Sequence, residues 1–155
     1  MMSLIFHPDP ILSTPTKPVT VFDSELENFC KDLTQAMYYF DGAGLAANQV
    51  GDNRSIFVIS EAVAQTEKPV VFINPSIIAC SCEVHLDEAC LSLPSRLFRV
   101  PRYLNVEVEA YDVDGTRFFG PTNRLYAQAI QHEMDHLNGI VLSDIAEEIP
   151  KPKRF

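Results

Sequence analysis

Hydrophobic residues recur at helical spacing in two stretches of the chain. In residues 25–40 the apolar stripe follows Ser24 and Glu27, which form a capping-box signature, and the pattern predicts an amphipathic helix. In residues 124–137 apolar side chains cover well over half of the helical wheel, and Gly139 follows the last turn. We therefore expect an amphipathic helix early in the chain and a mostly buried helix near its end.

Shorter apolar runs between these two helices are typical of strands. Residues 55–59 and 70–73 are rich in β-branched side chains and predict two buried strands. In residues 106–110 apolar side chains alternate with glutamates, which indicates a half-exposed strand. Asp114-Gly115 lies between two further runs and gives a strong hairpin signal.

Prolines mark where these elements are expected to break. Two prolines in residues 6–12 favour an extended or turn conformation, so this segment is expected to be an arm rather than a core element. Asn74-Pro75 is expected to end the second strand. Residues 140–142 can add a last strand, after which residues 144–155 resemble a polar tail.

Together the elements predict an α+β fold, in which antiparallel or mixed sheets pack around the C-terminal helix and an N-terminal amphipathic helix completes the core. A chain of 155 residues fits one domain, and we find no internal repeat and no dividing linker. We expect a single domain over residues 1–155, with a polar tail from about residue 146 and no long C-terminal helix.

Composition excludes several classes of protein. The chain is 46% hydrophobic and 21% charged, as in an ordinary globular domain. Its formal charge of -9 argues against a DNA-binding surface, since only residues 151–154 are locally basic. No apolar run approaches the roughly 18 residues of a membrane span, and residues 1–10 do not resemble a secretory signal. We therefore expect a cytoplasmic protein without membrane or DNA partners.

The four cysteines are better interpreted as thiols or metal ligands than as disulfides, because no secretory signal is present. Cys30 falls in the apolar stripe of the first helix and is expected to be a small core residue. Cys80 and Cys82 share one face of an expected strand over residues 77–84, and without a partner pair we treat them as structural. Cys90 is a candidate ligand.

The sharpest chemical pattern lies in the final helix, where His132 and His136 flank Glu133. Residues four apart on a helix lie about 40° apart on one face, so the two imidazoles and the carboxylate converge. This geometry suits a divalent metal with a bound water. The alternative is a pair of histidines on a solvated helix face, which the buried character of this helix disfavours.

Two other stretches are unusual. Gly42 and Gly44 end the first helix, where they allow positive φ and the close approach of another backbone, and the Gln49 amide could donate to a developing negative oxygen. Taken alone, a glycine-rich turn with a surface amide is the preferred interpretation. Cys90, framed by Glu88 and small residues, could be the missing third ligand.

In order and separation, three segments closely resemble the signature motifs of the peptide deformylases: Gly42–Gln49, Glu88–Ser92 and Gln131–His136. The resemblance covers most of the chain. It implies a metal-dependent hydrolase that removes the N-formyl group from the N-terminal formylmethionine of newly synthesised peptides and releases formate.

The resemblance also implies a metal site. Cys90, His132 and His136 would be the three protein ligands of one divalent ion, which is usually Fe²⁺ in this family, with Zn²⁺, Ni²⁺ or Co²⁺ as replacements. Glu133 would take a proton from the attacking water and deliver it to the departing amine.

The remaining roles follow from the same resemblance. The Gln49 side chain and the backbone N–H of Leu91 would hold the oxyanion. Glu88 would brace the cysteine loop by pairing with Arg102.

The substrate, a formylated nascent chain, would pair as an added strand with the main chain around Ala43 and Gly44. Ala43, Leu91 and Ala129 beside His132 would line the pocket for the methionine side chain.

The chain departs from the family pattern at two places. Ala89 stands where glycine is usual, so it would strain the loop carrying Cys90 if that position requires positive φ. The chain also ends about 16 residues after Gly139, without the long C-terminal helix that many members use for ribosome docking. Ribosome association, if any, would be weak and would use the basic tail. Minimal members of this kind occur in phages, which suggests a phage-infected host as one origin.

Two rival classes of protein fit the sequence less well. A metzincin-type zinc peptidase would need a third histidine at position 142, which is Leu142. A non-catalytic protein with a structural metal would normally offer four protein ligands, whereas three ligands beside Glu133 favour an open site.

Overall fold

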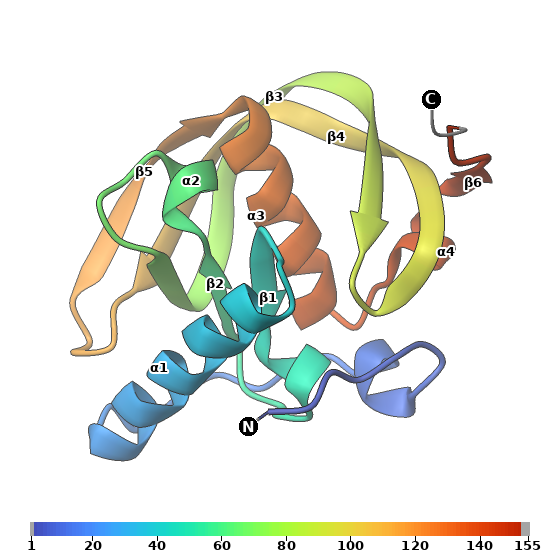
Figure 1. Ribbon diagram of the computed structural model, residues 1–155. Coiled ribbons are helices and arrows are strands. Elements are labelled where there is room, and N and C mark those ends of the chain that lie inside the picture. The colour runs from blue at the N-terminus through green and yellow to red at the C-terminus, as the bar shows by residue number, and fades with distance from the viewer. Residues whose placement is uncertain (1, 153–155) are drawn as a thin grey trace.

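A long β-hairpin that bends around one helix organises the structure (Figure 1). The computed structural model describes residues 2–152. Its elements, in chain order, are η1 (Pro10–Ser13), α1 (Ser24–Tyr39), β1 (Gly44–Ala46), η2 (Ala47–Val50), β2 (Ile56–Ile59), α2 (Glu61–Ala64), β3 (Val70–Cys90), β4 (Leu93–Tyr111), β5 (Arg117–Asn123), α3 (Arg124–Leu137), α4 (Leu142–Ile145) and β6 (Glu147–Ile149).

All ladders between the named strands are antiparallel. The strand order is β1-β2-β3-β4-β5, and β6 adds to β4. Within residues 2–152 the parallel pairing is limited to one isolated bridge between Lys17 and Arg54. The predicted α+β class is therefore correct, and its sheet is antiparallel rather than mixed.

The β3–β4 hairpin crosses the molecule and brings Cys90, the last residue of β3, to the side of α3. Its two strands have 21 and 19 residues, and their pairing is interrupted by three register shifts, the last between Glu88 and Cys90. Such irregularities bend a strand pair. In Figure 1 the far half of the hairpin arches over α3 and returns along its other side, so that the end of β3 lies beside the helix.

Helices cover both faces of β2 because its side chains alternate in direction. Ile56 and Val58 pack into a core with α1, whereas Phe57 and Ile59 pack into a core with α3. A third core lies beneath the end of the hairpin and consists of Leu12, Cys90, Leu93, Phe98, Val100, Val141 and Leu142. The helix α3 is thus held between the sheet and the returning hairpin.

The two main helices match the sequence pattern closely. The bounds of α3 are the predicted ones, and α1 differs by a single residue at each end. The cap of α1 is Asp23 rather than Ser24, because the Asp23 carboxylate accepts the Leu26 N–H at 3.0 Å. The predicted hairpin turn at Asp114-Gly115 is also present, and Gly115 has a φ of 84°.

The second strand does not end at Asn74-Pro75 as predicted. Asn74 takes a φ of 50°, and its side-chain amide hydrogen-bonds both backbone groups of Val19, at 2.8 and 2.9 Å. The chain then leaves β2 and continues along β4 as the rest of β3. A tertiary partner therefore overrides the local break signal.

The prediction of a strand over residues 140–142 is wrong. Val141 caps the short helix α4, and the Asp144 carboxylate accepts the Val141 N–H at 2.9 Å. The expected polar tail is also partly ordered into structure, because β6 pairs with Leu97–Arg99 of β4. The end of the expected tail, residues 153–155, lies outside the described residues.

Two further expectations need correction. The N-terminal arm contributes to the core, since Leu12 in η1 is fully buried. Cys80 and Cys82 are both exposed and therefore do not pack as structural residues, whereas Cys30 is buried as expected. No helix in residues 2–152 has the length and apolar character that a bilayer crossing needs.

Candidate metal centre

The C-terminal end of α3, next to His136, is fixed by close contacts with the N-terminal part of the chain. Gly139 after its last turn has a φ of 73°, and a Cβ there would come within 2.8 Å of the Ser13 backbone. Only glycine fits at this crossing. The arm also caps the helix, since the backbone N–H and the hydroxyl of Thr16 both donate to the Leu137 carbonyl, at 2.8 and 2.9 Å.

Three donor atoms converge between α3 and the end of β3. One ligand atom each from Cys90, His132 and His136 lie within 4.8 Å of one another. The Cys90 Sγ is 3.3 Å from the His136 Nε2, and their residues are only 7% and 2% exposed. A thiolate and two imidazoles at this spacing fit a tetrahedral divalent metal with one position left open. The alternative of histidines on a solvated face is therefore wrong.

Cys90 reaches this position from the end of a regular strand. Ala89 belongs to β3 and is not among the described residues with positive φ, so the expected strain in the cysteine loop is absent. Beyond it the chain turns tightly, with Cys90 paired to Leu93. Extended backbone accepts any side chain, which explains why alanine is tolerated here in place of glycine.

A buried ion-pair network holds His132 from behind. Arg102 donates two hydrogen bonds to Glu88, at 2.7 and 2.8 Å, and a third to Asp135 at 2.7 Å. Glu88 also contacts the His132 Nδ1 at 2.9 Å. Burial alone raises the pKa of Glu88, but the hydrogen bonds from Arg102 and His132 outweigh it and lower the pKa to about 2. The charged carboxylate accepts the His132 Nδ1 proton and fixes the ring, so that Nε2 is the atom that would bind a metal.

The two histidines differ in electrostatic environment. Burial alone lowers the pKa of His132, but the Cys90 thiol and the Glu88 carboxylate outweigh it and hold the pKa well above its usual value. Burial, together with the neighbouring His132, holds the pKa of His136 well below its usual value. His136 is therefore a neutral imidazole, which is the form that binds a metal.

Glu133 is a buried carboxylate beside the three donors. Its side chain is 4% exposed, and no hydrogen bond reaches its Oε2 from residues 2–152. Burial raises its pKa to about 7. A carboxylate with a pKa near neutrality and a free oxygen has the properties of a general base.

The strand β1 approaches Glu133 closely because it carries no side chain at Gly44. A Cβ on Gly44 would lie 3.0 Å from the Ile59 Cδ1 and 3.2 Å from the Glu133 Oε1, and a Cβ on Gly42 would lie 3.0 Å from the Leu91 Cδ1. Neither Gly42 nor Gly44 has positive φ. These glycines therefore provide room rather than an unusual backbone conformation.

Gln49 lies on η2 and is buried, so the alternative of a surface amide is wrong. Its Oε1 accepts the Ala46 N–H at 3.0 Å. Its Nε2 donates to the Ser92 hydroxyl at 3.1 Å and lies 3.7 Å from the Cys90 Sγ. The amide donor is thus held next to the cysteine ligand.

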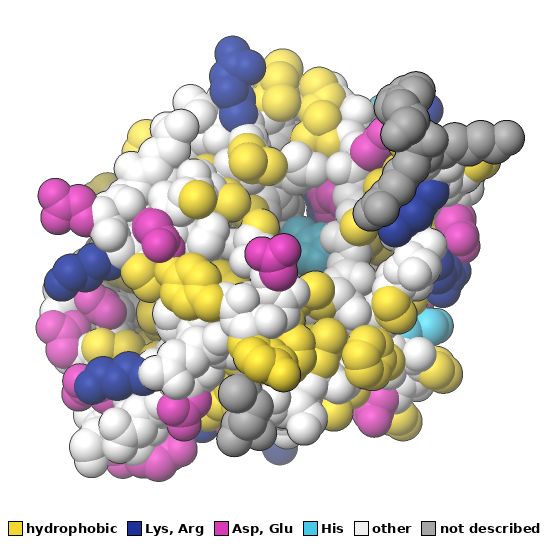
Figure 2. Space-filling view, viewed as in Figure 1, with side chains coloured by type: hydrophobic (Ala, Val, Ile, Leu, Met, Phe, Trp, Pro, Cys, Tyr) yellow, Lys and Arg dark blue, Asp and Glu magenta, His cyan; other side chains and the backbone are white. Residues whose placement is uncertain are grey.

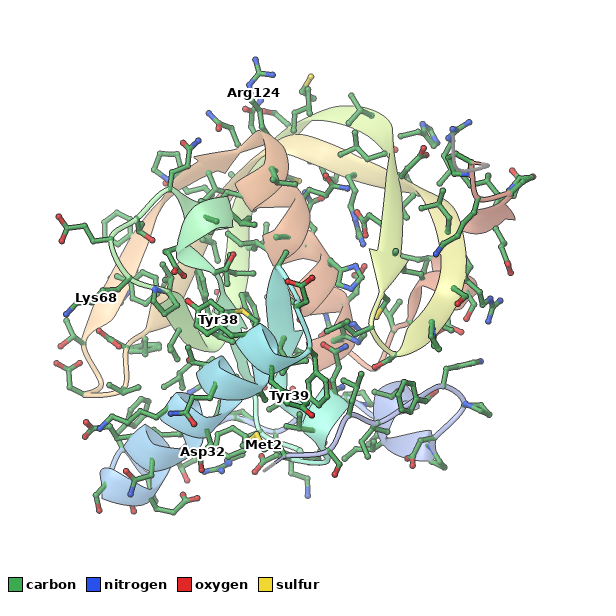
Figure 3. All side chains as sticks on the ribbon, in the orientation of Figure 1. Met2, Asp32, Tyr38, Tyr39, Lys68 and Arg124 are labelled. Carbon is green, nitrogen blue, oxygen red and sulfur yellow. The ribbon has the colours of Figure 1, made fainter. Side chains whose placement is uncertain are left out.

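A cavity of about 500 Å³ opens onto this centre, and Ala43, Leu91, Ala129, His132 and Glu133 are among its lining residues. Figure 2 shows the corresponding hollow in the middle of this face, with a histidine surface at its base and hydrophobic side chains along its lower rim. Figure 3 shows how side chains from α3 and the end of β3 point into the space between them, while Arg124 at the outer end of α3 points away.

Sequence reasoning missed four residues around the centre: Asn48, Ser92, Gln128 and Asp135. Asp135 pairs with Arg102, and Gln128 donates to Glu88 at 3.2 Å. Ser92 donates to the Ile5 carbonyl at 2.7 Å, which ties the arm to the cysteine loop. Helical spacing puts Gln128 and Asp135 near the face of His132, and that signal could have suggested them.

Comparison with known proteins agrees with this geometry. The polypeptide deformylase family matches residues 1–151. A peptide deformylase of Baumannia cicadellinicola is 37% identical over 153 residues, covering 99% of this chain and 91% of the relative. Two solved peptide deformylases have a TM-score of 0.89: that of Legionella pneumophila (34% identity; 94% of this chain, 85% of the other) and that of Thermotoga maritima (32%; 95% and 98%). Similarity over nearly the whole chain, in sequence and in fold, shows that it belongs to the polypeptide deformylase family.

Proposed function

We propose that Cys90, His132 and His136 hold one divalent metal ion and that Glu133 acts beside it as general base. The observation that carries this proposal is the convergence of three donor atoms next to a buried carboxylate oxygen that receives no hydrogen bond from the described residues, 2–152. As a member of its family, the chain is a metallohydrolase that removes the N-formyl group from nascent peptides. The family match over residues 1–151 supports a single catalytic domain.

When bound, the metal would polarise the formyl carbonyl and make a water molecule more acidic. Glu133 accepts one proton from the attacking water as the new C–O bond forms at the formyl carbon. It then gives this proton to the amine nitrogen as the C–N bond breaks, and the carboxylate is regenerated. The second water proton leaves with formic acid, which ionises to formate.

The oxyanion that forms during attack needs hydrogen-bond donors, and Gln49 and Leu91 are the proposed ones. The Gln49 Nε2 is held beside Cys90 by its contacts with the cysteine loop. Leu91 follows the cysteine directly and lines the cavity, so its backbone N–H is close to the reacting centre. Donors fixed before the reaction stabilise the developing charge without reorganisation.

The peptide is proposed to bind along β1. This strand is the first in the sheet order, and among the strands of residues 2–152 it pairs with β2 alone, so its other edge can accept an added strand. Backbone pairing at Ala43 and Gly44 suits substrates of many sequences. The methionine side chain would occupy the part of the cavity that Ala43, Leu91 and Ala129 line. Glu88 holds His132 in place through the Nδ1 contact, and Arg102 in turn holds Glu88.

Fe²⁺ is the proposed native ion, as is usual in the family. A thiolate with two imidazoles also suits Zn²⁺, Ni²⁺ and Co²⁺. An iron–thiolate centre would be sensitive to oxygen, because the cysteine sulfur can be oxidised. Anaerobic and aerobic preparations should therefore differ in activity when loaded with Fe²⁺.

The site of action is proposed to be the bacterial cytoplasm, where formylated chains are made. Contact with the ribosome would be weak. The basic segment of residues 151–154 supports such contact, because its positive charges would be attracted to ribosomal RNA although the chain as a whole is acidic.

The deciding experiment is an assay of formyl-Met-Ala-Ser with Fe²⁺-loaded protein under anaerobic conditions. Formate and free Met-Ala-Ser should appear in equal amounts, and acetyl-Met-Ala-Ser serves as the control for general amide hydrolysis. Cleavage between the amino acids would indicate a peptidase instead. Absence of formate release from stoichiometrically loaded protein would contradict the proposal.

A further inference from the structure

Asn48 lies next to Gln49 on η2 and carries a second buried amide, which contacts His136. Asn48 is 0% exposed, and its Nδ2 donates to the backbone carbonyl of His136 at 2.6 Å. The two residues are far apart in the sequence, and neither the metal-ligand pattern nor the oxyanion pair involves Asn48. Its burial beneath a ligand residue calls for a physical reason, since a buried amide needs partners for all its polar groups.

The orientation of the Asn48 amide is fixed by its neighbour. The backbone oxygen of His136 can only accept, so the NH₂ group must face it and the Oδ1 must face elsewhere. Within residues 2–152 no hydrogen bond reaches this Oδ1. Asn48 therefore offers a buried acceptor without a partner, next to a metal-ligand residue.

His136 offers a buried hydrogen-bond donor that matches the buried Asn48 acceptor. Its Nε2 faces the Cys90 sulfur at 3.3 Å, on the side of the proposed metal. A neutral imidazole that binds a metal through Nε2 carries its proton on Nδ1. This Nδ1 is also buried and donates no hydrogen bond to any group in residues 2–152. The other ligand histidine does not share this condition, because His132 Nδ1 has Glu88 at 2.9 Å.

We propose that Asn48 is the positioning residue of His136, with its Oδ1 accepting the Nδ1 proton directly or through one bridging water once the metal is held. Metal-bound histidines nearly always donate their second N–H to such an acceptor, which fixes the ring orientation and raises ligand basicity. Asn48 would do for His136 what Glu88 does for His132. This inference rests on the proposed metal site but concerns a residue that the site's chemistry does not require.

The place of Asn48 in the fold supports this role. The 3-10 turn η2 carries two consecutive amides that reach opposite halves of the centre. Gln49 contacts the cysteine loop, and Asn48 contacts the last turn of α3. One short turn thus positions the thiolate side and the imidazole side of the same centre.

The test compares Asn48→Asp with Asn48→Leu. Aspartate keeps an acceptor of the same shape, whereas leucine keeps the branching at Cγ, is somewhat larger and removes all hydrogen bonding. The readout is the Co²⁺ dissociation constant together with the visible absorption spectrum of the Co²⁺ protein. Asn48→Leu should weaken Co²⁺ binding about 10- to 100-fold, and Asn48→Asp should weaken it less than about tenfold. A purely structural role predicts the reverse order, because burying a carboxylate costs more stability than burying leucine.

The matched controls are Asn53→Asp and Asn53→Leu. Asn53 also has a buried Oδ1 that receives no hydrogen bond from residues 2–152, but its backbone carbonyl accepts the Lys17 N–H and it does not line the cavity at the centre. Both control variants should bind Co²⁺ like the parent protein. If Asn48→Leu does not fold in the metal-free state, Asn48→Ala replaces it with the same expectation.

Equal Co²⁺ affinity of Asn48→Leu and the parent protein, or weaker binding by Asn48→Asp than by Asn48→Leu, would overturn the inference. Either result leaves the proposed function intact as long as the parent protein binds one Co²⁺. A parent protein that binds no Co²⁺ would instead contradict the metal site itself.

Discussion

The charge of Glu88 should contribute about as much to stability as one large core side chain. The pKa of this carboxyl falls from its ordinary value of 4.5 to about 2 in the folded protein. Each tenfold change in proton affinity corresponds to about 1.4 kcal/mol, so the folded environment favours the charged form by about 3 kcal/mol. Removing one partner of a buried ion pair costs about 3–5 kcal/mol in other proteins, which agrees. Glu88→Gln should therefore lower the free energy of unfolding by about 3 kcal/mol at pH 7.

The assay is urea unfolding of the metal-free protein, with a chelator present, at a series of pH values. The pKa of Glu88 is lower in the folded state than in the unfolded chain, so its stabilisation is present above about pH 4.5 and is lost as the pH falls towards 2. The difference between parent and Glu88→Gln should thus be constant near neutrality and shrink in acid.

Asp87→Asn is the matched control. Asp87 pairs with Arg99 at 3.0 Å, but their side chains are 48% and 55% exposed, so the change should cost less than about 1 kcal/mol. The reasoning would be refuted if Glu88→Gln unfolded within about 1 kcal/mol of the parent at pH 7. A loss that did not change in acid would show that shape, and not charge, is what Glu88 contributes.

Three further changes test the centre and its support. Glu133→Gln should keep one metal per chain while formate release falls by about 10²–10⁴-fold, and unchanged turnover would remove the general base from the mechanism. Cys90→Ala should lose the metal, as measured by elemental analysis of dialysed protein, and full loading would place the third ligand elsewhere. Gly139→Ala should lower the free energy of unfolding by more than about 1 kcal/mol, because its φ is 73° and a Cβ would meet Ser13 at 2.8 Å. Gly120→Ala is its control, since a Cβ there has no neighbour within 4 Å.

Local signals in the sequence were sufficient for the two main helices and for the turn at Asp114-Gly115. The bounds of α3 follow from residues within a few positions of each end. The hairpin turn likewise follows from the Asp-Gly pair at its tip. The path of β3 could not be predicted in this way. Asn74-Pro75 reads as a stop, and only the pairing with β4 and the contact with Val19 carry the strand onward.

The same distinction applies to the centre. The ligand types and the base lie in short motifs, so the sequence indicated Cys90, His132 and Glu133 directly. Their supporting partners come from distant parts of the chain. Asn48 meets His136 across 88 positions, and Gln128 meets Glu88 across 40. Helical spacing could have placed Gln128 and Asp135 beside His132, but no periodicity connects Asn48 with His136 or either of them with the cysteine loop, and the resemblance alone suggested Glu88 and Arg102.

The N-terminal arm also sets the order in which this enzyme can be completed during synthesis. Thr16 closes the last turn of α3 from 121 positions away, and Ile5 is bound by Ser92 across 87. At synthesis rates of about 5–20 residues per second, the arm waits on the order of ten seconds for its helix partner to be made. All three ligands, Cys90 included, can come together only after α3 is made. The centre is therefore assembled only after Leu137 has been made, and no metal can be held by all three ligands before that point.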